Sequence, residues 1–303
     1  MASNSREIKR RIKSITNIGQ ITKAMELVSA AKMRKAQILA TASRPYAILS
    51  SKLLSNISAF TDTGKHPLLN RPLSKPQAAP KRILAIVISS DRGLAGAFNT
   101  NVINKTVNLM KEEGSEKFDF ITVGKKAADA VRRLNLNIIA SFSAKDKVNS
   151  LDARPISQIA MQEYLGVNPA VGGSASGGKY EKVLLIYSDF VSTLVQKPNM
   201  LQLLPFANER SALSAQRAEF LFEPDADQVL ESLITKTIEF TVYQALVEAS
   251  ASEHSARMVA MRNANEAAGD LLEDLSLSYN QARQAGITRE LSEISAAKLA
   301  MES

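Results

Sequence analysis

The 303-residue sequence contains no cysteine and no tryptophan, and it has only two histidines, His66 and His254. Without cysteine there can be no disulfide, thiolate metal site or cysteine nucleophile. Two histidines far apart in sequence give little support to a zinc site or to histidine-based acid–base catalysis. No run of eighteen apolar residues occurs, so no transmembrane helix is expected. Thiolate metal sites are therefore excluded, and other metal sites and histidine-based catalysis are not favoured.

A leader sequence is also not expected. The basic start MASNSREIKRR is not followed by an apolar segment, which a secretory signal peptide would need. We interpret it as mature sequence.

Charge of one sign is scarce at each end of the chain. The net charge is +8 overall, but it is about +9 over residues 1–52, about +7 over 53–207 and about −8 over 208–303. A basic segment is typical of proteins that bind nucleic acid or anionic lipid. The acidic C-terminal part allows another interpretation, in which the two ends of the chain pair with each other.

Proline is nearly absent from both ends. Residues 5–44 contain none and one glycine, Gly19, and no proline follows Pro224. Good helix formers dominate both segments, and forty residues in a helix would span ~60 Å. In the N-terminal segment an apolar stripe recurs every three or four residues: Ile8, Ile12, Ile15, Ile18, Ile21, Met25 and Val28.

The C-terminal segment has a 3.5-residue repeat, the period of a left-handed coiled coil. Its positions step alternately by four and three: His254, Met258, Met261, Asn265, Ala268, Leu272, Leu275, Tyr279, Ala282 and Gly286. We predict that the two terminal helices pair as an antiparallel coiled coil. Opposite charge would select the partner and apolar burial would hold it. Two ordinary helices in an all-α bundle are the weaker alternative, because the middle of the chain is not helical in pattern.

The middle of the chain alternates strands and helices, which predicts an α/β fold with a mostly parallel, Rossmann-like sheet. Strands are expected at 82–89, 119–124, 136–142, 182–190 and 200–206, with helices at 99–113, up to 134, and at 152–165. The predicted domains are an N-terminal coiled-coil helix at 1–60, a linker at 61–81, a central α/β domain at 82–207 and a C-terminal coiled-coil helix at 208–303.

Two glycine-rich stretches could bind phosphate. Gly173 to Lys179 spells most of a P-loop, but Tyr180 follows the lysine and a strand follows the loop, whereas a P-loop needs Ser or Thr and then a helix. We interpret it as a flexible surface loop. SSDRGLAGAF at 89–98 does lie between a strand and a helix, but it lacks the three glycines of the dinucleotide fingerprint. We favour a tight structural turn in which Asp91 and Arg92 pair or cap locally.

Several segments together resemble the gamma subunit of F-type ATP synthases. REIKRRIKSITNIGQITKAMELVSAAKMRKAQ (6–37) is similar to the start of that family, and SSDRGLAGAFN (89–99) to its central turn. YEKVLLIYSDFVSTLVQKP (180–198) and LLPF (203–206) are similar to its late strands. EHSARMVAMRNANEAAGDLLEDLSLSYNQARQAGITRELSEI (253–294) matches its C-terminal signature. The resemblance covers nearly the whole chain in the right order.

The resemblance implies a non-catalytic rotor subunit in a proton-translocating ATP synthase. Its partners would be the alpha/beta hexamer, the epsilon subunit and the c ring, with no nucleic acid and no catalytic nucleotide bound. The implied location is peripheral, on the cytoplasmic side of a bacterial plasma membrane. The regulatory cysteine pair of the chloroplast relatives has no counterpart here.

The resemblance also implies partner-contact residues. Arg283 and Gln284 match a pair that hydrogen-bonds a loop of beta, and a solvated helix face is the alternative. Met25 matches a methionine near the lever region of beta, and it is also a candidate for the helix seam. Further contacts are implied at Arg257, Thr288, Glu290 and Glu293. An apolar tip turning in a collar is implied at Ile294, Leu299, Ala300 and Met301, with Lys298 departing from the family pattern.

Two other functions remain open from the residues alone. A nucleotide-binding α/β enzyme would use Gly93 and Gly96 to cradle phosphate. A coiled coil that binds nucleic acid or lipid would use the basic cluster Lys9, Arg10, Arg11 and Lys13, which can equally be a solvated helix face or a basic sleeve facing the hexamer.

Overall fold

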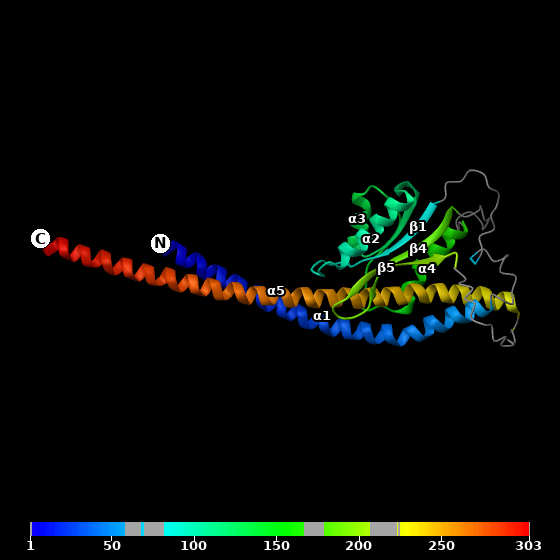
Figure 1. Ribbon diagram of the computed structural model, residues 1–303, viewed down its shortest axis with the longest axis horizontal. Coiled ribbons are helices and arrows are strands. Elements are labelled where there is room, and N and C mark those ends of the chain that lie inside the picture. Colours follow the sequence, from blue (N-terminus) through cyan, green and yellow to red (C-terminus); the bar gives the residue numbers. More distant parts are fainter. Residues whose placement is uncertain are drawn as a thin grey trace. The chain divides into compact units, whose positions relative to one another are not determined.

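The computed structural model describes residues 2–57, 68–69, 82–166, 179–206, 223 and 225–302. Figure 1 shows two long helices and a five-stranded sheet with helices on its faces. The long helices are α1 (Ala2–Ile57) and α5 (Ala226–Glu302). Between them the chain forms β1 (Arg82–Ile88), α2 (Phe98–Glu113), the 3₁₀ turn η1 (Ser115–Lys117), β2 (Phe118–Val123), α3 (Lys125–Arg133), β3 (Asn137–Phe142), α4 (Ser150–Leu165), β4 (Tyr180–Phe190) and β5 (Gln196–Leu204).

The predicted fold class is confirmed, because two long terminal helices enclose a mostly parallel sheet in the sequence. The predicted linker lies outside the described residues, apart from 68 and 69, and so does the glycine-rich stretch 171–178. The strand β4 begins directly after it, at Tyr180. A P-loop would be followed by a helix and not by a strand.

Compactness divides the chain across both long helices. One unit consists of residues 1–30 and 257–303, and the other of residues 31–256. The first unit is therefore a pair of helix segments, whereas the second contains the sheet, its covering helices and the remaining parts of α1 and α5. This grouping follows packing, while the predicted domains followed the order of elements in the sequence.

Helix α1 continues through Pro45 to Ile57, beyond the helical segment 5–44 recognised in the sequence. A proline inside a helix loses one backbone hydrogen bond and costs about 3 kcal/mol. Side-chain contacts to α5 flank the proline. Ser43 Oγ donates to Gln244 Oε1 at 2.5 Å, and the rings of Tyr46 and Phe240 lie 4.2 Å apart. These contacts hold the helix in place on both sides of the defect.

The sheet has the strand order β3-β2-β1-β4-β5, parallel except for β5, which pairs antiparallel with β4. Its central strand β1 reads RILAIVI and is buried almost throughout, as expected for a strand covered on both faces. Alternate side chains of β1 point to opposite faces of the sheet. Ile83, Ala85 and Val87 pack with α2 and α3, while Leu84, Ile86 and Ile88 pack with α4 and α5.

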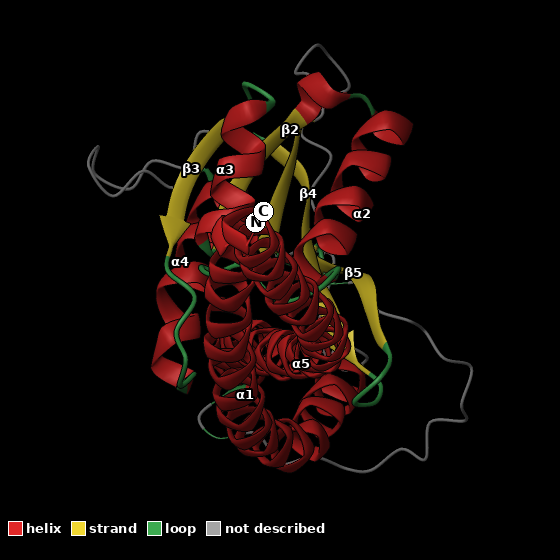
Figure 2. Ribbon diagram, turned by 90° about the vertical axis from the view of Figure 1, so that its left-hand side faces the viewer, coloured by secondary structure: helices red, strands yellow, loops and turns green. Residues whose placement is uncertain are grey.

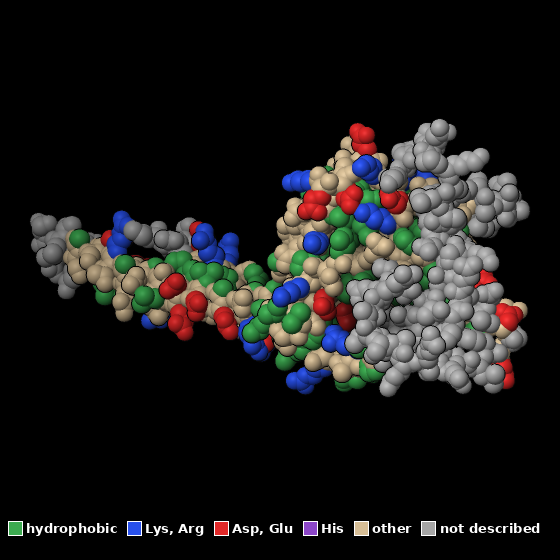
Figure 3. Space-filling view, turned by 45° about the vertical axis from the view of Figure 1, so that its right-hand side comes forward, with side chains coloured by type: hydrophobic (Ala, Val, Ile, Leu, Met, Phe, Trp, Pro, Cys, Tyr) green, Lys and Arg blue, Asp and Glu red, His purple; other side chains and the backbone are tan. Residues whose placement is uncertain are grey.

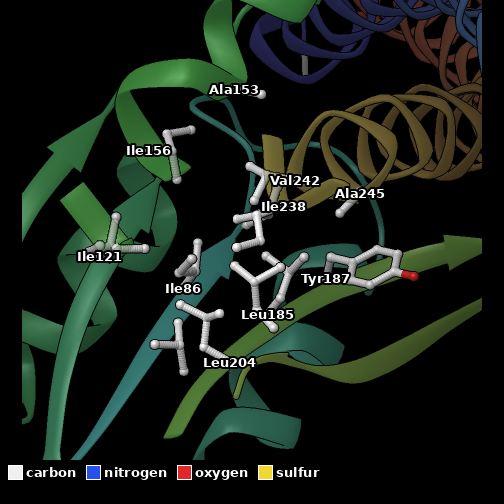
Figure 4. Close-up of a cluster of buried hydrophobic side chains, with 14 of the residues drawn as sticks. Ile86, Ile121, Ala153, Ile156, Leu185, Tyr187, Leu204, Ile238, Val242 and Ala245 are labelled. Atoms are coloured by element: carbon white, nitrogen blue, oxygen red, sulfur yellow. The ribbon is translucent and has the colours of Figure 1, made fainter. Parts of the chain in front are cut away.

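The larger core lies on the α4 and α5 face of the sheet (Figures 2 and 4). Helix α5 supplies residues at helical spacing, including Ile238, Val242 and Ala245, and α4 supplies Ala153 and Ile156. Figure 4 shows these side chains converging with Ile86, Ile121, Leu185, Tyr187 and Leu204 from the strands. Apolar burial of this kind fixes the sheet-covering part of α5 within the second unit.

A fully buried carboxylate, Asp119, ties together the amino ends of the parallel strands. Its Oδ2 accepts from Arg82 Nε at 2.8 Å and from Tyr180 Oη at 2.7 Å. Its Oδ1 accepts from Arg82 Nη2 at 2.5 Å and from Asn137 Nδ2 at 2.8 Å. These partners stand at or next to the starts of β1, β3 and β4. One side chain therefore sets the relative register of four strands.

Candidate partner interface

The first unit is a pair of antiparallel helix segments. Arg262 of α5 contacts Glu26 of α1, and Ala268 of α5 lies next to Gly19. The residue number on α5 falls as the residue number on α1 rises, so the two segments are antiparallel, as predicted. Figure 1 shows α1 and α5 side by side in this part of the chain.

The α5 side of this pair follows the predicted 3.5-residue repeat. Each of its positions in the first unit is buried or half-buried: Met258, Met261, Asn265, Ala268, Leu272, Leu275, Tyr279, Ala282 and Gly286. His254, the first position of the predicted repeat, is buried in the second unit. The coiled-coil period read from the sequence is therefore confirmed on α5.

The predicted stripe on α1 is correct only at its beginning. Ile8, Ile12 and Ile15 are half-buried, but the positions expected to follow, Ile18, Ile21 and Val28, are about half exposed. The inward positions are instead small or polar: Gly19, Thr22, Glu26 and Ser29. These continue the step of four and three without interruption. The sequence prediction failed because it followed hydrophobicity, while the register placed small residues against α5.

Charged side chains occupy one layer of the contact between α1 and α5. Glu26 is buried and accepts from Lys23 Nζ at 2.9 Å and from Arg262 Nε at 3.3 Å. The hydrogen bond from Lys23 and the nearby Arg262 guanidinium lower the pKa of Glu26, although burial opposes them. Thr22 donates to the Gly19 carbonyl oxygen at 3.0 Å within its own helix. Small and paired polar groups thus make a narrow contact between the two helices.

A hydrophobic strip on α1 is left uncovered by this register. We call Ile18, Ile21 and Val28 the outer strip; their exposed fractions are 49%, 59% and 55%. They recur at helical spacing on one side of α1, and Met25 lies between them and is half-buried. Figure 3 shows hydrophobic side chains gathered along the paired helices, with basic and acidic side chains beside them. A continuous apolar strip on a slender helix pair is typical of a surface that contacts another protein.

The end of α5 is more exposed still. From Ile287 onward every residue whose side chain is described is exposed, including Leu291 and Ile294. The C-terminal end of α5 extends past the start of α1 (Figure 1). Because no α1 residue faces this end, its apolar side chains have no partner within the described part of the first unit. Met301, one of the predicted tip residues, has an exposed fraction of 88%; Leu299 and Ala300 belong to α5, and their side chains lie outside the description.

The residues that the resemblance marked as partner contacts have different exposures. Arg283, Gln284, Thr288, Glu290 and Glu293 are exposed on α5. Arg283, Ile287, Glu290 and Ile294 recur at helical spacing on one side of the helix, and Gln284, Thr288 and Leu291 recur on another. Glu293 accepts from Arg289 Nε at 3.1 Å within the same helix.

Arg257 differs from the other predicted contact residues because it is buried. The basic cluster Lys9, Arg10, Arg11 and Lys13 is exposed, with Arg11 paired to Glu7 at 2.6 Å.

Side chains of the turn at residues 89–98 hydrogen-bond to neighbouring parts of the protein. Asp91 Oδ1 accepts from the backbone N–H groups of Lys125 at 2.9 Å and Ala144 at 3.2 Å. Ser90 and Asn99 hydrogen-bond each other at 2.8 Å. Asp91 thus joins this turn to the start of α3, as a structural turn requires. The Asp91 carboxylate therefore caps the N-terminus of α3, whereas the helix that follows the turn is α2.

Within the described residues no group of three or more His, Cys, Asp or Glu side chains could hold a metal ion. None of the helices in that part of the chain is both long and apolar enough to cross a bilayer.

Nearly the whole chain is similar to a known protein family. The family model described as ATP synthase matches residues 4–301. A curated relative from Pelotomaculum thermopropionicum, named ATP synthase gamma chain, is 42% identical over 98% of this chain and 99% of its own length. Another gamma chain, from Herpetosiphon aurantiacus, is 39% identical over 99% of both chains. The chain belongs to the ATP synthase gamma chain family, whose members are non-catalytic subunits.

Solved structures agree with this assignment. A chain from the central stalk and c-ring structure of the Tetrahymena thermophila mitochondrial ATP synthase superposes with a TM-score of 0.58 and 27% identity. It covers 80% of this chain and 99% of that one. A chain of the Euglena gracilis mitochondrial ATP synthase gives a TM-score of 0.66 over 99% of this chain and 95% of that one. At 19% identity the second match shows the shared fold alone.

Proposed function

We propose that this chain is the central-stalk rotor subunit of an ATP synthase and transmits torque between a membrane-embedded c ring and a catalytic alpha/beta hexamer. The observation that carries the proposal is the antiparallel helix pair of the first unit, which has an uncovered outer strip and an exposed apolar end. Membership of the gamma chain family and the likeness to a central-stalk structure support it.

The asymmetry of the helix pair supplies a mechanism. A hexamer with threefold symmetry offers three equivalent sites, and one rod in its centre cannot contact all three alike. The rod has an apolar side on α1 and mixed polar sides on α5. Each side favours a different conformation of the neighbouring subunit, by as much as its contacts differ between conformations. Shifting one site from 1:99 to 99:1 requires about 5.5 kcal/mol of differential binding.

Named residues carry this differential contact in the proposal. Arg283 offers a rigid fork of donors suited to a carboxylate on the hexamer, and Gln284 adds an amide next to it. Thr288, Glu290 and Glu293 extend the contact along α5, Met25 extends it on α1, and Arg257 is the buried member of the proposed set. The sheet-bearing second unit would engage the epsilon subunit and the c ring. The location proposed is the cytoplasmic side of a bacterial plasma membrane, peripheral to the bilayer.

A reconstitution with matched variants tests the contact on α5. Arg283→Ala and Gln284→Ala should reduce the ATPase or the coupling of a hexamer assembled around this chain, while far-UV circular dichroism stays unchanged. Ser278→Ala is the control, because Ser278 is an exposed polar residue of α5 on a different side of the helix from Arg283 and Gln284. Equal activity of all three variants and the wild type would remove the contact assignment. The rotor proposal itself fails if the chain does not co-purify with a hexamer in a ratio of one to three to three.

A further inference from the structure

A cavity of about 370 Å³ lies within the second unit, at the carboxyl end of the parallel strands. Ile88, Val123 and Phe142, which line it, are the last residues of β1, β2 and β3. The segment 143–148 and the helices α4 and α5 form its remaining walls. We call this cavity the strand-end pocket. Open α/β sheets bind ligands at the carboxyl ends of their strands, so the pocket lies where such a fold can hold a small molecule.

The inner wall of the strand-end pocket is apolar. Besides the strand ends, it contains Ile156 of α4 and Leu246 and Ala249 of α5, all of which are buried members of the larger core. An apolar cavity of about 150 Å³ stays dry and takes up benzene. The strand-end pocket is more than twice as large and falls within the range of roughly 300–1,000 Å³ that is usual for ligand sites. It therefore has room for a compact apolar body of about two fused rings or a small cage.

The segment 143–148, which forms the outer wall, is held in place from two sides. The Ala144 N–H donates to Asp91 Oδ1 at 3.2 Å. Lys32 Nζ, from the part of α1 in the second unit, donates to Asp146 Oδ2 at 2.7 Å. The wall is thus joined both to the turn after β1 and to α1. Ligand sites are usually formed before the ligand arrives, and these contacts provide such a preformed wall.

The polar groups at the start of α4 disfavour an anion as the ligand. Lys145 Nζ donates to Asp152 Oδ1 at 2.6 Å, and the Asn149 N–H donates to Asp152 Oδ2 at 2.9 Å. Burial alone would raise the pKa of Asp152, but the hydrogen bonds from Lys145 and Asn149 outweigh it and lower the pKa. The ionised carboxylate therefore occupies the N-terminus of α4 and pairs with the lysine. An anionic ligand would have to compete with Asp152 for both groups.

The charge of the lining favours a cation instead. Among the described residues that line the pocket, Lys145 is basic, and Asp152 and Glu253 are acidic. The lining therefore carries a formal charge of −1 at neutral pH. Glu253 is half-buried and lies four residues after Ala249, so the two share one side of α5. A carboxyl group thus stands directly beside the apolar wall.

We propose that the strand-end pocket binds a compact apolar amine, with its hydrocarbon body against Ile156 and Ala249 and its ammonium group at Glu253. Transfer of the hydrocarbon out of water supplies the affinity. The ammonium group meets a negatively charged wall that water screens only in part, which sets the preference for a cation. This site is separate from the helix pair of the first unit, so its occupancy can be tested in the full-length chain without a hexamer.

Tryptophan fluorescence of the full-length Leu151→Trp variant tests where the ligand binds. The chain has no tryptophan of its own, and Leu151 lines the pocket with an exposed fraction of 74%. Aminoadamantane, a rigid cage with one ammonium group, should change the emission in a saturable way. Leu194→Trp is the matched control, because Leu194 is 77% exposed and lies between β4 and β5, outside the lining. The pocket assignment is refuted if residue 151 gives no saturable change, or if residue 194 gives the same one.

Equilibrium dialysis of the unmodified chain measures the preference for a cation. Aminoadamantane should bind with a Kd below about 1 mM, and at least about tenfold more tightly than adamantanecarboxylate, which carries the opposite charge on the same cage. Glu253→Gln should abolish this preference. Glu231→Gln is the control, since Glu231 is exposed on the same helix and outside the lining, and it should leave both affinities unchanged. Equal binding of the two cages to the wild type, or an undiminished preference in Glu253→Gln, would refute the proposed ligand class.

Filling the cavity provides an independent arm. Ala249→Leu places three further carbon atoms in the apolar wall and should weaken the binding of both cages by at least tenfold. Circular dichroism checks that this variant is folded, and if it does not fold, the comparison of Glu253→Gln with the wild type still decides. Wild-type affinity in a folded Ala249→Leu chain would show that the amine binds elsewhere.

Discussion

Removing the Asp119 carboxylate should weaken the sheet more than any exposed substitution. Asp119→Ala leaves Arg82, Asn137 and the Tyr180 hydroxyl without the acceptor that they share at 2.5 to 2.8 Å. Removing one partner of a buried ion pair costs about 3–5 kcal/mol, a large part of the roughly 5–15 kcal/mol that stabilises a typical domain. Tyr180→Phe removes a single hydrogen bond to the carboxylate and should cost about 1.5–3 kcal/mol.

Native-state hydrogen exchange of the β1 to β4 amides is the appropriate assay. The chain has two compact units, so a single unfolding free energy is not well defined, whereas exchange reports the sheet alone. Glu116→Ala is the matched control, because Glu116 is an exposed acidic residue three positions before Asp119. If Asp119→Ala weakens protection no more than Glu116→Ala does, the proposed role of the buried carboxylate in setting the strand register is wrong.

The remaining predictions concern pH and backbone. Burial alone would raise the pKa of Asp119, but hydrogen bonds from Arg82, Asn137 and Tyr180 outweigh it and lower the pKa below 3.8. Protection of the sheet amides from exchange should therefore hold above pH 3.8 and decline as the pH falls through the lowered pKa. Asp119→Asn should remove this decline. Gly124 has a φ of +91° and an added Cβ would lie 2.4 Å from the Ser89 carbonyl oxygen, so Gly124→Ala should cost more than the roughly 1–3 kcal/mol of backbone strain and reduce the yield of folded protein. At Gly19 an added Cβ would meet Ala268 and Asn265 at 3.8 Å, an ordinary contact. Gly19→Ala should therefore stabilise helix α1 by about 1 kcal/mol. A lower helical signal in circular dichroism would contradict this. Pro45→Ala restores the amide that α1 lacks and should stabilise that helix by up to about 3 kcal/mol, seen as slower exchange around residue 45.

Periodicity and composition predicted most of the fold. The absence of proline marked α5 and residues 5–44 of α1, and the β-branched run at residues 82–88 marked the buried central strand. The 3.5-residue repeat on α5 could be predicted directly from the sequence, because its positions follow one another at a constant step of four and three. The α1 seam could not, since Ile18, Ile21 and Val28 compete with Gly19, Thr22 and Glu26 for the inward side. Only the facing helix decides between the two sets.

The polar clusters were also beyond sequence reasoning. Asp119 and Tyr180 are 61 positions apart, and Glu26 and Arg262 are 236 apart, so no local pattern brings them together. The strand β5 begins several residues before its predicted start and includes Pro198, a residue type that argues against a strand but is tolerated at a sheet edge. The partner contacts on α5 are predicted from resemblance alone, since exposed side chains on a helix carry no periodic signal.

The solitary end of α5 has a consequence for how the chain behaves outside an assembly. Residues 287 to 302 form about four turns, roughly 24 Å of helix, with no α1 residue opposite them. A peptide of that length is only marginally helical in water, and contact of its apolar side chains with a surrounding protein surface would be favoured over contact with solvent. In the free subunit this end of the helix should therefore fray, and its last turns should become ordered only when a partner protein surrounds them.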